Sequence, residues 1–193
     1  MNNEEDEHKK ERIRIMEKVL IVVDMQNDFV TGSLGTKEAQ EIVPNIKRKI
    51  DEYLKNGDMV FFTYDTHYDN YFDTLEGKNL PVKHCICETE GWKIVPELRK
   101  IDCLYCNQIV NIKKDTFGYV NWNSYLPYVD KSLEIELCGV CTDICVVSNA
   151  LILRAIYPNA TIFVDAYHCA GSTPEKHEAA LEVMKSCQME VIE

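Results

Sequence analysis

A continuous run of five apolar residues, Val19 to Val23, ends abruptly at Asp24. Such a run is typical of a strand that is buried on both faces, because a strand with one face in water alternates apolar and polar residues. A strand buried on both faces needs other elements packed above and below its sheet. The run therefore predicts an α/β protein whose first strand lies in the middle of a mainly parallel sheet.

Strand-like and helical patterns alternate along the rest of the chain. Further strands are predicted over residues 59–63, 108–112, 133–137, 160–164 and 189–192, and helices over 38–54, 142–156 and 174–187. The helix 142–156 is rich in Val, Ala, Leu and Ile, so we expect it to be buried on most sides. Strands separated by helices indicate right-handed βαβ units. Residues 67–98 show no clear hydrophobic periodicity. Irregular segments of this length in a compact domain often carry functional residues.

Charge and hydropathy exclude several classes of function. The chain of 193 residues carries a formal charge of −11, which argues against a nucleic-acid or anionic-membrane partner. It contains no apolar run of about 18 residues, which a membrane-spanning helix needs, and its start does not resemble a signal peptide. We therefore expect a cytoplasmic protein, with a charged N-terminal tail over residues 1–17 and one domain over residues 18–193.

The chain contains nine cysteines, which is an odd number. A secreted disulfide scaffold is usually shorter and has an even count, so the alternatives are metal ligation, catalysis and burial as small apolar side chains. The pairs Cys103–Cys106 and Cys138–Cys141 have the spacing of zinc ligands but lie too far apart for a zinc ribbon. We therefore expect most of the cysteines to fill the core.

Polar residues follow several predicted strands at the point where each strand ends. They are Asp24, Asp65, the pair Lys113–Lys114, the turn from Gly139 to Cys145, and Asp165. Ligands of open α/β sheets bind outside the carboxyl ends of the strands. We therefore expect these groups to converge at one edge of the sheet.

Cys145 falls in the first turn of the predicted helix 142–156, where Thr142 or Asp143 could cap the helix. Free backbone N–H groups and the helix dipole at that position would lower the pKa of the thiol. The same N–H groups could stabilise an oxyanion. Alternatively, Cys145 is a buried cysteine at the start of a helix, with no chemical role.

A cysteine nucleophile needs a base or a nearby cation, and none of the five histidines falls at a predicted strand end. Asp24 could instead accept the thiol proton, and Lys114 could stabilise the thiolate. The alternatives are that Asp24 is a turn residue and that Lys114, in a Lys-Lys pair, is solvated.

A metal site is the second candidate for chemistry. Asp65 and His67 alternate after a predicted strand, so both side chains can point the same way, and His84 lies further along. One carboxylate and two imidazoles suit zinc or another divalent transition metal. Glu76 or Asp73 could add a further ligand.

Three motifs together resemble those of the isochorismatase-like cysteine hydrolases. They are Val22–Phe29 followed by Gly32–Leu34, Lys114–Gly118, and Gly139–Val146, and they occur in the order typical of that family. The resemblance implies a Rossmann-like three-layer α/β/α sandwich with a mainly parallel six-stranded sheet. It also implies a catalytic triad of Asp24, Lys114 and Cys145. The backbone amides of Cys141 and Cys145 would form an oxyanion hole, next to a cis peptide between Val140 and Cys141.

The segments 65–67 and 80–85 are similar to the metal-site segments of the nicotinamidase/pyrazinamidase branch. This resemblance implies a divalent metal ion, with zinc as the first choice, held by Asp65, His67 and His84, and provisionally by Glu76. Phe29 matches an aromatic position that packs on the substrate ring.

The chain departs from that branch at three positions. Asp73 stands where many nicotinamidases have a second His, Leu80 stands where a Trp is common, and Lys83 is an extra residue. The resemblance therefore does not determine the fourth metal ligand or the wall of the substrate pocket, whereas the triad positions match the family.

The resemblance implies a cysteine amidase that hydrolyses nicotinamide, or a similar small aromatic amide, through a thioester, with a role in NAD salvage. We expect a homo-oligomer that takes a small-molecule amide and binds neither nucleic acid nor membrane. Two alternatives remain: a sibling hydrolase of another amide, a ureido acid or a vinyl ether, and a non-catalytic oligomeric binding protein that keeps the fold.

Overall fold

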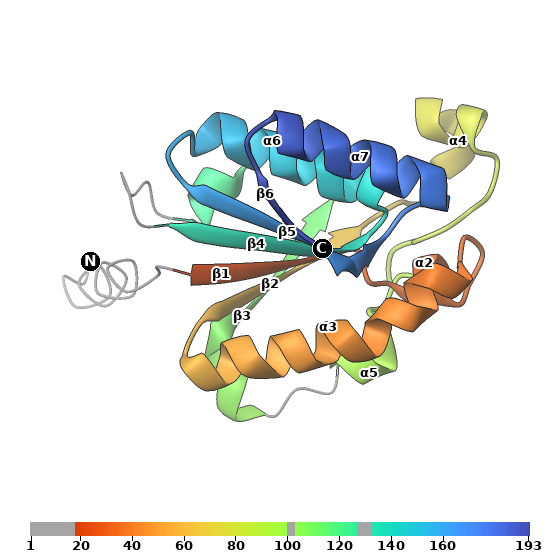
Figure 1. The fold of residues 1–193 in the computed structure, drawn as a ribbon. Helices are drawn as coiled ribbons and strands as arrows, with labels where there is room; N and C mark the ends of the chain where they lie inside the picture. The colour runs from red at the N-terminus through yellow and green to blue at the C-terminus, as the bar shows by residue number, and fades with distance from the viewer. Residues whose placement is uncertain (1–17, 100–102, 127–132) are drawn as a thin grey trace, which may run out of the picture.

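The computed structural model describes residues 18–99, 103–126 and 133–193 (Figure 1). The charged tail predicted over residues 1–17 lies outside the described residues.

Six parallel strands form one sheet in the order β3-β2-β1-β4-β5-β6. Their bounds are β1 (Lys18–Val23), β2 (Met59–Asp65), β3 (Ile109–Lys114), β4 (Glu134–Val140), β5 (Thr161–Ala170) and β6 (Glu190–Ile192). The apolar run of β1 lies between β2 and β4, and residues 19–23 are fully buried. The predicted α/β class and six-stranded sheet are therefore confirmed.

Helices cover both faces of the sheet (Figure 1). On one side lie α3 (Lys37–Asn56) and α5 (Pro96–Arg99), and on the other lie α6 (Val147–Ile156) and α7 (Pro174–Ser186). Two short helices, α2 (Asn27–Val30) and α4 (Leu75–Asn79), lie at the carboxyl end of the sheet. The Thr36 hydroxyl caps α3 by accepting from the Ala39 N–H at 3.0 Å, and Gly57 ends it with a φ of 88°. The result is the expected three-layer sandwich.

The predicted helix 142–156 consists of two pieces. A π-helical turn (Thr142–Val146) precedes α6, and neither Thr142 nor Asp143 caps it, which corrects our expectation. The Thr142 hydroxyl instead lies 2.8 Å from Nδ1 of His177, and Asp143 accepts hydrogen bonds from the backbone and hydroxyl of Ser172. These distant partners compete with local capping. The helix is also less buried than expected, since Leu151 is 39% exposed.

The strand β5 continues to Ala170, six residues beyond its predicted end. Asp165 therefore lies in the middle of the strand and does not reach the carboxyl edge, contrary to our expectation. It lies 2.9 Å from Nζ of Lys49, a residue of α3 that also pairs with Glu136 on β4. Tyr53 donates a hydrogen bond to Glu136. We call Lys49, Tyr53, Glu136 and Asp165 the Lys49 cluster.

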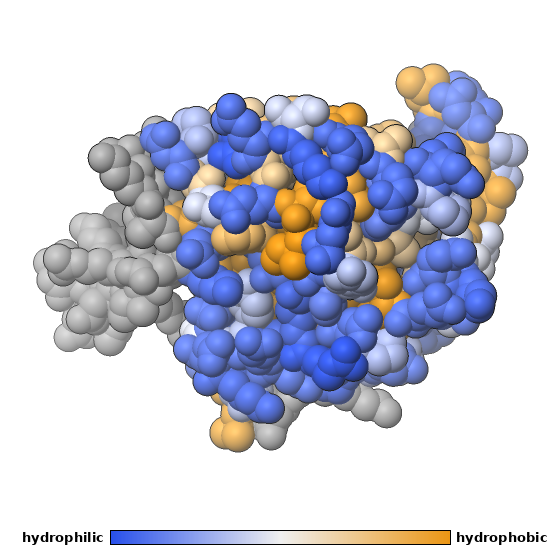
Figure 2. All heavy atoms as spheres, in the orientation of Figure 1, coloured by the Kyte–Doolittle hydropathy of each residue, from blue (hydrophilic) through white to orange (hydrophobic). Residues whose placement is uncertain are grey.

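The outer surface is largely hydrophilic in the view of Figure 2, in particular over α3. Hydrophobic residues appear at the projecting corner formed by α4, whose segment exposes Phe72, Leu75 and Leu80. Among the described helices, none combines the length and apolar character needed to cross a membrane.

Candidate active site

Asp24 comes directly after β1, in the left-handed backbone region with a φ of 48°. That conformation is uncommon for a residue with a Cβ atom, and the surroundings must hold it. The hydroxyl of Thr63 on β2 accepts from the Asp24 N–H at 3.1 Å and donates to Asp24 Oδ1 at 2.6 Å. The neighbouring strand thus fixes both the backbone and the side chain of a fully buried Asp24.

Lys114 brings the predicted site residues together. It is the last residue of β3, and its Nζ lies 2.6 Å from Asp24 Oδ2 and 3.7 Å from Cys145 Sγ. Its partner in the β2–β3 register is Asp65, whose Oδ1 lies 3.5 Å from the same Nζ. Asp24, Lys114 and Cys145 therefore form one buried constellation at the carboxyl edge of the sheet.

The chain between β4 and the π-helical turn places Cys145 against this edge. Gly139 has a φ of 115°, and a Cβ atom there would lie 2.2 Å from the backbone oxygen of Val23. Only glycine allows this close approach of β4 to β1. The peptide between Val140 and Cys141 is cis, as the resemblance implies.

The pKa of the Cys145 thiol is raised, which is opposite to our expectation from its position near a helix start. Burial is the main cause, and the charges of Asp24 and Asp65 and a hydrogen bond to Asp24 add to it. Lys114 opposes these effects without outweighing them. Cys145 is therefore a thiol at rest and needs a base to become nucleophilic.

Opposing effects also set the charges of the other two groups. Burial raises the pKa of Asp24, although Lys114 acts to lower it. Burial alone would lower the pKa of Lys114, but the charge of Asp24, followed by interactions with Cys145 and Asp65, outweighs it and raises that pKa. Lys114 thus stays a cation, and the raised pKa of Asp24 increases its affinity for a proton.

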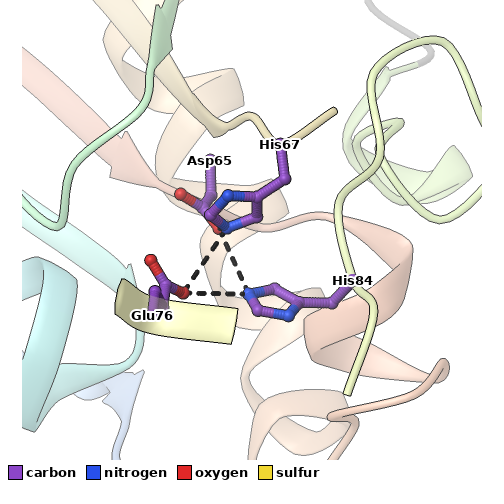
Figure 3. Close-up of side chains that lie close together, drawn as sticks. All are labelled: Asp65, His67, Glu76 and His84. Atoms are coloured by element: carbon purple, nitrogen blue, oxygen red, sulfur yellow. Dashed lines mark ion pairs between the residues drawn. The ribbon is translucent and has the colours of Figure 1, made fainter. Parts of the chain in front are cut away.

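Four candidate metal ligands, among them the Asp65 that lies beside Lys114, gather in one cluster. Figure 3 shows their side chains. The ligand atoms of Asp65, His67, Glu76 and His84 all lie within 4.8 Å of one another. Nε2 of His67 lies 2.9 Å from Asp65 Oδ2, and Nε2 of His84 lies 3.5 Å from both Asp65 Oδ2 and Glu76 Oε1. Asp73, the alternative to Glu76, is exposed and lies outside this cluster.

The donor set fits a divalent ion such as zinc. Nε2 of His67 is buried without a hydrogen bond of good geometry, and Nδ1 of His84 lies 2.9 Å from the Val82 oxygen, which leaves Nε2 for a metal. Two imidazoles and two carboxylates are ligands that zinc accepts.

Each of the two histidines forms ion pairs with both carboxylates. Burial would lower the pKa of each imidazole, but the carboxylates of Asp65 and Glu76 raise it, to about 9 for His67 and about 10 for His84. Burial would raise the pKa of Glu76, but the hydrogen bonds from the two histidines lower it to about 2. A metal ion would therefore have to displace protons from both histidines.

Two residues that support the candidate metal ligands, Tyr71 and Gly77, were not predicted from the sequence. Tyr71 is fully buried, its ring centroid lies 4.8 Å from that of His67 and 5.2 Å from that of His84, and its hydroxyl donates to the Leu80 oxygen. A Cβ atom at Gly77 would lie 2.1 Å from the Tyr71 oxygen, so glycine is required there.

Gln26, inside the first motif, clamps the end of β2. It accepts from the Asp65 N–H at 2.8 Å and donates to the Asp65 oxygen at 2.9 Å. Its role could have been predicted from the sequence, because Gln26 follows Asp24 by two residues and so places a second polar side chain at the same strand end.

A pocket of about 320 Å³ opens onto Cys145 and onto the candidate metal ligands Asp65, Glu76 and His84, which together with His67 we call the metal cluster. Its lining residues are Phe29, Leu34, Thr36, Asp65, Glu76, Leu80, His84, Phe117, Cys141, Ile144, Cys145, Ser172 and Lys176. The ring of Phe29 lies 5.4 Å from that of His84, so an aromatic face stands beside a candidate metal ligand. The volume is at the lower end of the range of about 300–1,000 Å³ that is typical of small-molecule sites.

Comparison with known proteins identifies the family. Residues 18–193 match the isochorismatase domain. The chain belongs to the isochorismatase family. A crystal structure of a nicotinamidase/pyrazinamidase from Bacillus subtilis is 27% identical, covers 92% of this chain and all of that chain, and superposes with a TM-score of 0.76.

Two further relatives are similar to this isochorismatase-family chain. A pyrazinamidase of Pyrococcus horikoshii, solved in complex with zinc, is 27% identical with a TM-score of 0.73, over 92% of this chain and 99% of that chain. A probable inactive nicotinamidase of Arabidopsis thaliana is 27% identical over 86% of this chain and 87% of the relative. The likeness supports the nicotinamidase branch of the family.

Proposed function

We propose that this isochorismatase-family protein is a cysteine amidase that hydrolyses nicotinamide, or a similar small aromatic amide, to the acid and ammonia. The observation that carries the proposal is the position of Lys114 Nζ, 2.6 Å from Asp24 and 3.7 Å from Cys145, beside a pocket open to the metal cluster. A base, a cation and a thiol in contact are the groups that amide cleavage by cysteine requires.

In the first half of the reaction, Asp24 accepts the thiol proton and Cys145 Sγ attacks the amide carbonyl. Lys114 stabilises the negative charge on sulfur. The backbone N–H groups of Cys141 and Cys145 bind the oxyanion, where losing one donor costs about 10²–10³ in rate. The tetrahedral intermediate then expels the amide nitrogen, which takes the proton from Asp24 and leaves as ammonia.

In the second half, Asp24 accepts a proton from water, and the resulting hydroxide attacks the thioester carbonyl. The C–S bond breaks, Asp24 returns its proton to Cys145, and the carboxylic acid departs. The raised pKa of Asp24 suits both proton transfers, because a base must release its proton as readily as it accepts it.

Residues of the pocket walls would orient the substrate. Asp65, His67, Glu76 and His84 would hold a divalent ion, for which the zinc-bound Pyrococcus relative and the donor set both argue. When bound, the ion would supply a Lewis acid that anchors a ring nitrogen. Phe29 would pack on the face of the ring.

The decisive experiment is ammonia release from a panel of amides that includes nicotinamide, with wild-type protein, Cys145→Ala and chelator-treated protein. We expect turnover by the wild type, none by Cys145→Ala, and a reduced rate after chelation. Retention of most of the turnover by Cys145→Ala would rule out the mechanism.

A second candidate substrate class follows from Lys176. It lines the pocket and makes no ion pair with any described residue, and the pocket wall carries Leu80 where a Trp is common. A cation at this position would favour an amide or ureido acid that carries a carboxylate remote from the scissile bond. Ureido acids therefore belong in the panel. If the protein hydrolyses them in preference to nicotinamide, ureido acids and not nicotinamide are its substrate class.

A non-catalytic role remains the third candidate, because the Arabidopsis relative is described as probably inactive. This role would be favoured if no amide in the panel is hydrolysed and one of the amides binds tightly.

A further inference from the structure

A second pocket lies on the reverse side of the strands that carry the candidate site. It has a volume of about 380 Å³, and an adjoining pocket of about 290 Å³ shares four of its lining residues. We call it the edge groove, because it follows β3 at the edge of the sheet. Its lining residues are Tyr64, Trp92, Lys93, Ile94, Arg99, Asn111 and Lys113.

Strand geometry relates the edge groove to the candidate active site. Tyr64 pairs with Lys113 across β2 and β3, and the next pair in the register is Asp65 with Lys114. Successive side chains of a strand point to opposite faces of the sheet. The pair Tyr64–Lys113 therefore lines the groove, and the pair Asp65–Lys114 belongs to the metal cluster and the catalytic constellation.

Two aromatic rings form one wall of the groove. The centroids of Tyr64 and Trp92 are 5.0 Å apart, and Lys113 Nζ lies 4.7 Å from the centre of the Trp92 ring. The Trp92 indole N–H donates to the Thr66 hydroxyl at 3.0 Å, which fixes the ring. A wall of held aromatic rings is suited to stacking against a planar ligand.

Three cations line the same groove in a chain with a net charge of −11. Lys93 is neutralised by Glu90. Within the described part of the chain, Arg99 and Lys113 make no ion pair with a carboxylate, although Lys113 Nζ lies 3.8 Å from Cys87 Sγ and the charge of Arg99 also acts on Glu90. Two unpaired cations beside aromatic rings create a local field that attracts an anion.

We propose that the edge groove binds a planar ring compound that carries an anionic group, either a ring carboxylate or a nucleotide. The ring stacks on Tyr64 and Trp92, and the anion pairs with Lys113 and Arg99. This inference goes beyond the proposed amidase activity and does not depend on it.

A hydrogen-bonded bridge connects an occupant of the groove with the candidate active site. The Gln26 amide donates both to the Trp92 oxygen at 2.7 Å and to the Asp65 oxygen at 2.9 Å. A ligand that shifts Trp92 therefore acts through Gln26 on the strand end that holds Asp65.

Intrinsic fluorescence provides a direct test, because the chain has two tryptophans and Trp122 is fully buried. The probes are benzoate and adenosine monophosphate, with benzyl alcohol and adenosine as their uncharged counterparts and inorganic phosphate as the anion alone. We expect saturable quenching by at least one anionic ring compound, and binding about tenfold weaker in Lys113→Gln and in Arg99→Gln. The probe that saturates identifies the source of the ligand.

Two further variants assign the signal. Trp92→Phe should abolish the quenching, whereas Phe29→Ala, in the substrate pocket, should leave it unchanged. The proposal is overturned if neither anionic probe saturates, if phosphate or the uncharged counterparts bind equally well, or if quenching persists in Trp92→Phe. It is equally overturned if Phe29→Ala weakens binding and Lys113→Gln does not.

Discussion

Lys114 and Asp24 form an ion pair of 2.6 Å in which both side chains are buried, with exposed fractions of 1% and 0%. A buried pair gains little over a pair of apolar residues, because both charges lose their hydration. Breaking it from one side leaves an uncompensated charge in the core. The pair is therefore better explained by function than by stability, and its two members are sensitive positions.

Lys114→Met should lower the free energy of unfolding by about 3–5 kcal/mol, because it leaves the Asp24 carboxylate without its cation. Urea denaturation at pH 7 measures this. The adjacent Lys113→Met removes the same charge from an exposed position and should change the free energy of unfolding by no more than about 1 kcal/mol, the upper value for an exposed cation–π contact such as the one with Trp92. Adding Asp24→Asn to Lys114→Met should restore part of the loss. Equal effects of the two lysine variants would contradict the burial argument.

Glu76→Gln should weaken zinc binding by at least tenfold, because it removes one of two carboxylates from the cluster. Competition with a chromogenic chelator gives the affinity. Asp73→Asn is the matched control: it removes a carboxylate from the same segment, but from outside the cluster, and should leave zinc affinity unchanged. A larger effect at Asp73 than at Glu76 would mean that α4 moves when the metal binds.

Much of the fold and part of the site follow from short-range sequence patterns. The apolar run of β1 predicts a central strand, and the carboxyl ends of neighbouring parallel strands must meet at one edge. Asp24 and Lys114 could therefore be placed together before the structure was known. Asp165 could not be excluded in this way, because the length of β5 depends on its pairing with β4 beyond a register shift.

The features that were mispredicted or missed depend on tertiary contacts. The pKa of Cys145 follows burial rather than helix position, and burial is a property of the packed molecule. The partners of Thr142 and Asp143 are His177 and Ser172, which lie about 30 positions away in the sequence. Tyr71 acts on His67 and His84 only because Gly77 lets α4 approach it.

Cys145→Ala should reduce amidase turnover by at least about 10³-fold, whereas Cys141→Ala should keep it within a few-fold. Both side chains line the pocket, but only the Cys145 sulfur contacts Lys114 among the described contacts, and Cys141 would contribute its backbone N–H. Burial, followed by the charge of Asp143, raises the pKa of Cys141 to about 12, which keeps its thiol protonated at neutral pH. Steady-state ammonia release from both variants measures the difference. Comparable losses would assign a chemical role to the second sulfur.

Lys49→Met tests the Lys49 cluster, which is remote from the metal ligands. Burial would raise the pKa of Asp165, but hydrogen bonds from His168 and Lys49 lower it. In the wild type, Asp165 therefore contributes stability above its unfolded pKa of about 3.9 and loses that contribution only as the pH falls through the lower folded value. Between pH 7 and pH 5 this contribution is constant.

Removing Lys49 reverses that dependence. Burial then acts on Asp165 without the opposing charge of Lys49, so we expect its folded pKa to rise above the unfolded one and stability to increase as the pH falls. We expect Lys49→Met to be about 3–5 kcal/mol less stable than the wild type at pH 7 and to recover part of this at pH 5. Lys47→Met, on the same helix but in an exposed pair with Asp51, should change stability by less than about 1 kcal/mol at either pH. A deficit of Lys49→Met that is the same at both pH values would show that the loss comes from packing and not from the unpaired carboxylates.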